Sequence, residues 1–323
     1  MRFLVAPDSF KGTFGAAEVA EAIAAGIEAG GGEADRCPVA DGGEGTMEVL
    51  IGALGAERRT ASVHDPLRRP IEADFGLLGD GGTAIVETAQ ASGLPLVAAG
   101  ERDAERADTY GTGELIAAAA RAGATKVLLA VGGSATTDGG AGSIEALREA
   151  GLLGKVEIEV LCDVRTPYED AARVFAPQKG ADAAAVERLT ARLEALAAEL
   201  PRDPRSVPMT GCAGGLSGGL WAHGARLSPG AAFVLDALGF DERLARADAV
   251  VSGEGRFDSQ SLEGKIVGEI AVHCERADKP LHLVVGEDGF TGERSTAVAS
   301  VTEAGTLAAM RQMGRDLATG RSA

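Results

Sequence analysis

Apolar positions along the chain repeat one arrangement: a short apolar run, a loop rich in glycine or aspartate, and an alanine-rich amphipathic pattern. The first example is the run at 3–6, which is followed by a loop at 7–13 and then by Val19, Ile23 and Ile27. These three residues are spaced by four, so they form one apolar stripe on a helix, and the glycines at 30–32 end it. The repeat is typical of the strand–loop–helix units of an α/β fold.

Similar units begin at the apolar runs 38–40, 126–131, 156–162 and 248–252, and residues 183–200 have the 3–4 spacing of a long amphipathic helix. Residues 60–90 differ, because short alternating runs broken by prolines and glycines predict antiparallel strands and hairpins. After residue 280, the runs 281–285 and 298–301 again resemble buried strands. We therefore predict two α/β domains. Residues 1–60 and 280–323 form a discontinuous α/β domain in which both chain ends share one sheet, and residues 61–279 form an inserted α/β domain.

The charge of the chain limits its possible partners, and its cysteines indicate its compartment. The chain has 48 acidic and 31 basic residues, a formal net charge of −17, so most of its surface repels nucleic acid and anionic membranes. No stretch approaches the ~18 apolar residues of a membrane span, and the N-terminal apolar run is too short for a signal peptide. The four cysteines lie far apart without a CxxC pair, which favours reduced thiols. We expect a cytoplasmic protein with neither nucleic acid nor membrane as partner.

Glycine-rich loops after the predicted strands are the first candidates for chemistry, since ligands of open parallel sheets bind at the carboxyl ends of strands. The loop GGSATTDGGAG at 132–142 offers backbone N–H groups, hydroxyls and a carboxylate, which predicts a phosphate cradle. A tight structural turn is the alternative. The predicted nucleotide contacts are Gly132, Gly133, Ser134, Thr136, Thr137, Gly139 and Gly140, with Asp138 as a metal ligand. The chain lacks a Walker A motif, because Lys265 is not followed by Ser or Thr.

A second charged loop, GEGRFDSQS at 253–261, follows a buried-looking strand. We assign Gly253 and Glu254 to nucleotide binding, Arg256 to substrate binding and Asp258 to the metal. A surface loop with internally paired charges is the alternative. Two further positions complete this set: Asp163, at a strand end, as a metal ligand, and Lys179 as a substrate-binding cation.

The loops at 7–13 and 41–46 carry the residues expected to act on the substrate. A lysine beside two carboxylate loops suits an anionic substrate whose hydroxyl must be activated. We predict that Lys11 holds the substrate carboxylate and that Asp41 orients the hydroxyl or accepts its proton. Asp8 takes that role if the two loops converge, and Ser9 and Glu44 contact the substrate. The alternative for Asp41 is an N-cap of the following helix.

Eight motifs in order resemble the bacterial glycerate kinase family: PDSFKG, ADGGEGT, ETAQASGL, YGTGEL, GGSATTDGGAG, FAPQKGA, AGGLSGG and GEGRFDSQSLEGK. The resemblance implies two α/β domains around an active-site cleft, one of them, from both chain ends, with a Rossmann-like parallel sheet. It also implies phosphorylation of D-glycerate by ATP with Mg²⁺, and 2-phosphoglycerate as the product. The stretch between Gly142 and Asp163 is shorter than is usual for the family.

Two rival interpretations remain, and the assembly is open. A non-catalytic nucleotide or sugar-acid binding protein derived from a kinase would have lost charged loop residues, and these are present. A phosphatase with an aspartyl nucleophile would need a DxDxT strand end, which the sequence lacks. A homodimer is left open.

Overall fold

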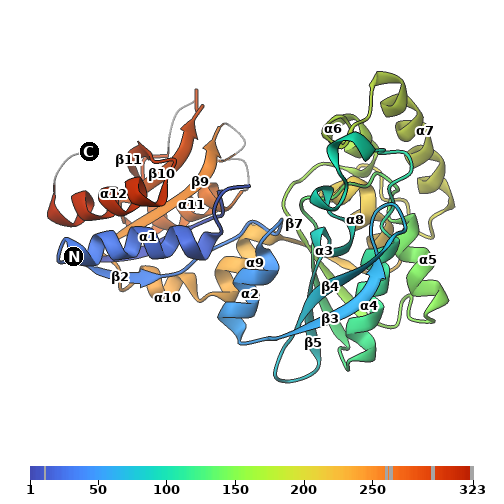
Figure 1. The fold of residues 1–323 in the computed structure, drawn as a ribbon, viewed down its shortest axis with the longest axis horizontal. Helices are drawn as coiled ribbons and strands as arrows, with labels where there is room; N and C mark the ends of the chain where they lie inside the picture. The colour runs from blue at the N-terminus through green and yellow to red at the C-terminus, as the bar shows by residue number, and fades with distance from the viewer. Residues whose placement is uncertain (11, 259–260, 262–264, 292–294, 321–323) are drawn as a thin grey trace. The chain divides into compact units, whose positions relative to one another are not determined.

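A computed structural model describes residues 1–10, 12–258, 261, 265–291 and 295–320. The chain divides into two compact units. The terminal domain comprises Met1–Asp41 and Ala231–Ala323, and the middle domain comprises Gly42–Gly230. Figure 1 shows strands and helices in both, so each has its own α/β core.

The terminal domain is built on a sheet of five strands whose neighbours all run parallel, in the order β11-β10-β9-β1-β2. Its strands are β1 (Arg2–Pro7), β2 (Glu33–Arg36), β9 (Ala249–Phe257), β10 (Leu281–Asp288) and β11 (Val298–Glu303). The strand predicted at 38–40 lies earlier, at β2. The backbone continues along β1 beyond it, because Cys37 N–H donates to Val5 O and Val39 N–H to Pro7 O.

Helices cover both faces of this sheet: α1 (Ala16–Ala29), α9 (Gly230–Ala237), α10 (Phe240–Leu244), α11 (Ile266–Ala277) and α12 (Leu307–Thr319). Alternate residues of β1 point to opposite faces. Phe3 and Val5 pack with α1 and α12, whereas Leu4 and Ala6 pack with α10 and α11. Figure 1 shows α1 beside α12. Their close approach requires Gly26, since a Cβ there would lie 1.9 Å from Arg311 O.

The middle domain has a mixed sheet in the order β3-β4-β5-β6-β7-β8. β3 (Glu57–His64), β4 (Pro70–Leu77) and β5 (Thr83–Glu87) are antiparallel neighbours. β6 (Lys126–Ala130), β7 (Glu157–Cys162) and β8 (Arg226–Pro229) continue from β5 in parallel. The antiparallel strands predicted within 60–90 are therefore confirmed.

The helices of the middle domain are α2 (Thr46–Leu54), α3 (Ala89–Ser92), α4 (Tyr110–Arg121), α5 (Ala141–Glu149), α6 (Ala171–Phe175), α7 (Ala183–Glu199) and α8 (Cys212–Ala222). Short 3₁₀ turns are η1 (Leu94–Leu96), η2 (Ala99–Glu101), η3 (Tyr168–Asp170) and η4 (Pro177–Lys179). The long helix predicted at 183–200 is α7. The apolar side chains of α4 and α8 share one core with those of β6 and β7.

The domain boundaries differ from the predicted ones near residues 60 and 280, and lie after Asp41 and after Gly230. The antiparallel hairpin at 57–77 is the edge of the middle sheet, so the change of pattern near residue 60 marks a sheet edge. At the other boundary, β9 lies between β1 and β10, which places 231–279 in the terminal domain. The predicted fold class, two α/β domains with a Rossmann-like parallel sheet from both chain ends, is confirmed.

Two findings concern membrane insertion and the state of the cysteines. Over the residues that the structure describes, no helix combines the length and apolar character that crossing a bilayer requires. The four cysteines, Cys37, Cys162, Cys212 and Cys274, are buried free thiols.

Candidate active site

An acidic pocket lies within the terminal domain, at the carboxyl ends of its central strands. Its volume is about 490 Å³, and six of the predicted site residues line it: Asp8, Ser9, Asp41, Glu254, Arg256 and Asp258. The parallel pairing of Pro7 with Gly253 brings the loop after β1 beside the last residues of β9. Asp8 N–H donates to Gly253 O at 2.8 Å, which fixes the start of the first loop. We call this the acidic pocket.

Glu254 is a partly buried carboxyl group of the acidic pocket. Its Oε1 is buried and has no hydrogen-bond partner among the described residues. Burial raises the pKa of Glu254 to about 7; the charges of Asp41 and Asp258 also raise it, and Ser261 and Lys265 lower it. A carboxylate with a pKa near neutrality and an oxygen free to accept a proton is suited to general base chemistry.

The acidic pocket also contains two described cations. Arg256 is exposed, and its Nε lies 3.8 Å from Asp258 Oδ2. Lys265 lies at the N-cap of α11, so its ammonium and the helix N-terminus add positive potential at one side of the pocket. Sequence reasoning missed Lys265 as a site residue. A cation between an acidic loop and an amphipathic pattern was the available signal. Lys11 lies outside the described residues.

Gly253 and Glu254 lie in the terminal domain, in contrast to the prediction that groups them with the nucleotide loop at 132–142. Gly253 is buried in β9, where a Cβ would meet Val284 O at 2.0 Å. Its absence of a side chain is therefore needed for packing between strands, and its carbonyl positions Asp8.

The loop at 132–142 lies in the middle domain between β6 and α5 and is mostly buried. Gly133 is the exposed residue among 131–140, with φ +68°. Gly139 packs so closely against Tyr168 that a Cβ would lie 2.0 Å from its hydroxyl. The N–H groups of Ala135 and Gly139 donate to Ser92 O and Gly214 O, so these two amides serve the loop's own structure. Exposed backbone suited to a ligand is thus centred on Gly133.

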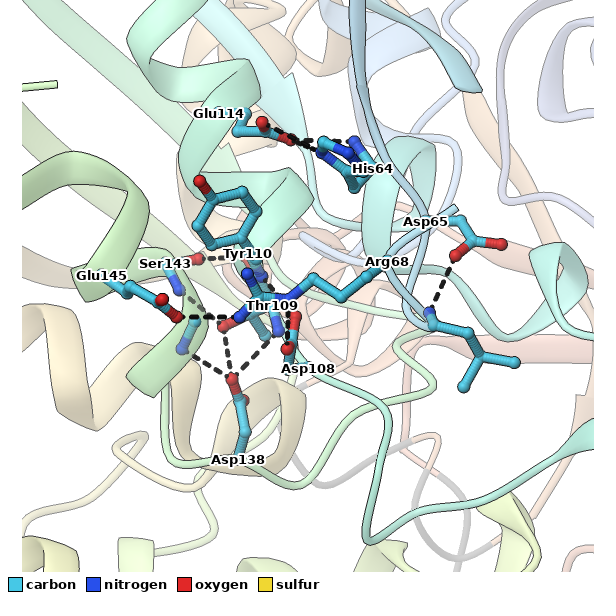
Figure 2. Close-up of polar contacts among 12 residues, drawn as sticks. His64, Asp65, Arg68, Asp108, Thr109, Tyr110, Glu114, Asp138, Ser143 and Glu145 are labelled. Carbon is cyan, nitrogen blue, oxygen red and sulfur yellow. Dashed lines mark hydrogen bonds and ion pairs between the residues drawn. The ribbon is translucent and has the colours of Figure 1, made fainter. Parts of the chain in front are cut away.

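Asp138 organises the second half of this loop (Figure 2). Its Oδ2 accepts from Thr109 N–H at 3.0 Å, Thr109 Oγ1–H at 2.8 Å and Gly142 N–H at 3.0 Å. Its Oδ1 accepts from Gly140 N–H at 3.2 Å. The side chain is fully buried. Because both oxygens already accept from protein donors, this geometry fits a structural carboxylate and not the metal ligand that the sequence suggests.

Lys179 is buried in the middle domain, with 2 % of its surface exposed. Its ammonium donates to Ser134 Oγ at 3.0 Å and to Thr136 O at 2.5 Å. Burial lowers its pKa to about 8, against the opposing charges of Asp138 and Asp163. The lysine predicted to bind substrate therefore holds the glycine-rich loop. The hydroxyls of Thr136 and Thr137 are buried without a partner among the described residues.

Glu87, at the end of β5, is a buried residue that sequence reasoning did not assign. Its carboxylate accepts from Gly45 N–H and Met47 N–H at 3.0 to 3.1 Å, so it caps the first turn of α2. Burial raises its pKa to about 7, against the lowering by these two N–H groups. Glu44, predicted to contact substrate, lies in the middle domain, and its Oε2 is 3.2 Å from the position a Cβ on Gly133 would take. A lone glutamate ending a buried strand was the only signal for Glu87.

Within the described ranges, no group of three or more His, Cys, Asp or Glu side chains is arranged to hold a metal ion. Mg²⁺ at phosphoryl-transfer sites is usually held by one or two carboxylates together with substrate phosphates. The carboxylates of the acidic pocket fit that mode, since Asp258 lines the cavity together with Asp8 and Asp41. A cage made by protein ligands alone does not fit.

This chain is similar to known proteins both in sequence and in fold. The model of the glycerate kinase family matches residues 3–152 and 148–317. Glycerate 2-kinase of Escherichia coli K12 is 39% identical over 324 residues, covering 88% of this chain and 85% of that protein. Glycerate kinase of Bacillus subtilis is 39% identical over 336 residues, covering 92% and 87%. A crystal structure from Salmonella typhimurium LT2, described as glycerate kinase 2, has a TM-score of 0.83 at 33% identity and covers 99% of this chain and 98% of that one.

The fold and the loops are thus those of an α/β phosphotransferase, and the family and sequence matches extend over nearly the whole chain. This chain belongs to the glycerate kinase family. The predicted resemblance is confirmed. The two matched segments overlap at 148–152, inside the stretch between Gly142 and Asp163 that is expected to be short for the family.

Proposed function

We propose that this protein transfers the γ-phosphoryl group of ATP to D-glycerate and forms 2-phosphoglycerate. Relatives described as glycerate kinase and glycerate 2-kinase support the reaction and its regiochemistry. The observation that carries the proposal is the acidic pocket, in which Asp8, Asp41 and Glu254 meet two cations. A small hydroxy acid needs such a pairing of a proton acceptor with a positive group.

The acidic pocket is proposed as the glycerate site. Arg256 and Lys265, together with Lys11, bind the substrate carboxylate. Asp41 orients the reacting hydroxyl, and Glu254 accepts its proton, since burial raises the pKa of Glu254 to about 7. Asp8 and Ser9 also line the site, and Ser9 N–H donates to Asp8 Oδ1 at 2.6 Å.

Magnesium is proposed as the companion of the nucleotide, with Asp258 of the acidic pocket as a protein ligand. Asp163, in the middle domain, stays a predicted metal ligand. When bound, Mg²⁺ neutralises the charge that develops on the transferred phosphoryl group. Asp138 is not part of this proposal, because N–H and O–H donors occupy both of its oxygens.

The exposed backbone around Gly133 is proposed to bind the nucleotide phosphates, with Gly132 and Ser134 beside it. Thr136, Thr137, Gly139 and Gly140 are assigned to holding the loop, because they are buried. Lys179 holds the same segment through its hydrogen bonds to Ser134 Oγ and Thr136 O. We further propose a cytoplasmic location, which the free thiols support. A homodimer stays a prediction.

Release of ADP by the purified protein tests this function. Protein with ATP, Mg²⁺ and D-glycerate should release ADP well above a control without glycerate, and L-glycerate should be a poorer acceptor. ADP release that does not depend on glycerate would reject the proposed acceptor. Nucleotide binding without any turnover would favour the non-catalytic binding protein.

A further inference from the structure

Arg68 lies in the turn between β3 and β4 with φ +62°, in the left-handed region. Glycine adopts this conformation without penalty, whereas an arginine there is uncommon and strained. The turn itself does not depend on the arginine side chain. Asp65 holds it, because its Oδ1 accepts from Leu67 N–H at 2.8 Å and from Arg69 N–H at 2.9 Å.

Among the described residues, the guanidinium of Arg68 bonds to or stacks on three side chains, which lie on α5 or at and just before the start of α4 (Figure 2). Its Nε donates to Asp108 Oδ2 at 2.6 Å, and its Nη2 donates to Glu145 Oε2 at 2.8 Å. Its Cζ lies 3.8 Å from the centroid of the Tyr110 ring. A planar cation that stacks and forms two charge-assisted bonds is a geometry that lysine cannot reproduce.

These contacts lead directly to the glycine-rich loop. Asp108 and Tyr110 flank Thr109, which donates twice to Asp138. Thr109 Oγ1 also accepts from Ser143 N–H at 3.0 Å, and Ser143 Oγ–H donates to Thr109 O at 2.7 Å. Burial raises the pKa of Asp108, Arg68 lowers it, and the Asp138 charge raises it further. Arg68 therefore neutralises a carboxylate that would otherwise repel the central carboxylate of the loop.

We propose that Arg68 is a positioning residue for nucleotide binding: through Asp108 and Tyr110 it holds Thr109 against Asp138 and thereby fixes the loop at 132–142. The inference rests on the proposed role of that loop. Backbone strain in the turn is retained because the guanidinium fixes the start of α4 relative to α5.

Arg68→Gly separates positioning from turn stability, because glycine suits φ +62° while the guanidinium is lost. Ser206→Gly is the matched control, since Ser206 is another exposed residue of the middle domain with φ +61°. Arg68→Lys keeps the charge without the planar fork. The readouts are KM for ATP, KM for D-glycerate and the Kd of a non-hydrolysable ATP analogue with Mg²⁺ by calorimetry. All are measured well below the Tm of each variant.

Arg68→Gly should raise the nucleotide Kd and the KM for ATP about tenfold, and leave the KM for D-glycerate within about twofold. Arg68→Lys should lie between it and the wild type, and Ser206→Gly should match the wild type. A nucleotide Kd within about twofold of the wild type in Arg68→Gly overturns the proposal. Equal increases in both KM values would also overturn it. Calorimetry reads nucleotide binding without turnover, so a wild type inactive on glycerate would reject the proposed function and still test this inference.

Discussion

The ammonium of Lys179 lies 3.0 Å from the hydroxyl of Ser134, although the two residues are 45 positions apart in the sequence. The same ammonium donates to the carbonyl of Thr136. One buried cation from the turn η4 thus fixes two points of the glycine-rich loop. A buried charge is retained only where partners satisfy it, so this contact specifies the conformation of the loop.

Replacing Lys179 should therefore affect the loop before anything else. Lys179→Met leaves Ser134 and Thr136 without a buried donor, which should lower the free energy of unfolding by about 1–3 kcal/mol. The nucleotide Kd should rise about tenfold, while KM for D-glycerate changes little. Chemical denaturation and calorimetry measure both, with the exposed Lys155→Met as control. A stable variant with unchanged nucleotide affinity would mean that the amine only fills space.

Stability around Glu254 should depend on pH in a defined direction. The folded protein keeps the Glu254 proton up to about pH 7, whereas the unfolded chain releases it near the ordinary value of 4.5. Protonation therefore stabilises the fold fully below pH 4.5, and this contribution disappears as pH rises through 7.

Glu254→Gln lacks this titration. Relative to the wild type, its free energy of unfolding should increase by up to about 3 kcal/mol between pH 4.5 and 8. Denaturant titrations at several pH values measure this, and the exposed Glu242→Gln should run parallel to the wild type. A flat difference between Glu254→Gln and the wild type would show that the carboxyl group is solvated.

Steady-state kinetics should distinguish the acids of the pocket. Glu254→Gln should lower kcat by about 10²–10⁴-fold, the usual cost of losing a general base. Asp41→Asn and Asp8→Asn should have smaller effects on kcat, and Lys11→Met should mainly raise KM for D-glycerate. Glu287→Gln is the control, because Glu287 lines the same pocket but is exposed.

Two other kinetic results would change the assignment of the general base or of the glycerate site. A large loss in Asp41→Asn with near-wild-type kcat in Glu254→Gln would return the base to Asp41, as the sequence suggests. Near-wild-type kcat/KM in all these variants would exclude the acidic pocket as the glycerate site.

The phosphate-binding role of Gly133 can be separated from its backbone strain. Gly133→Val combines an unfavourable φ of +68° with a side chain over the exposed backbone. Gly151→Val incurs the same φ cost, since Gly151 also has φ +68° and no atom within 4 Å of a Cβ position. Both should lose similar stability, of about 1–2 kcal/mol, but only Gly133→Val should weaken nucleotide binding. Equal nucleotide Kd values in the two variants would make the loop purely structural.

Local patterns predicted the strand–loop–helix units and the loops that converge on the acidic pocket. Asp8 directly follows β1, Glu254 lies in the second half of β9, and Asp41 follows the segment that continues from β2 along β1. Parallel strands deliver their carboxyl ends to one edge of a sheet. Strand order is not local. The local pattern at 248–252 does not indicate that β9 lies between β1 and β10, so the pattern predicts the wrong domain for the charged segment 253–261.

Residue type alone also left the role of several polar side chains open. Asp138 has the chemistry of a metal ligand, but its oxygens accept from the N–H groups of Thr109, Gly140 and Gly142. Lys179 has the charge expected of a substrate-binding residue, yet it is buried in the folded domain, where its ammonium donates to Ser134 Oγ. These partners come from distant segments, so only the assembled core determines whether such a group faces a ligand or its own loop.

Phosphorus NMR of the reaction product tests the central claim most directly. Purified protein with ATP, Mg²⁺ and D-glycerate should convert the γ-phosphoryl group into a phosphomonoester whose phosphorus couples to the single proton on C2 of glycerate. ADP should appear in equal amount. Coupling to the two protons on C3 would contradict 2-phosphoglycerate as product. Inorganic phosphate, or no new resonance, in place of a phosphomonoester would contradict phosphoryl transfer to glycerate altogether.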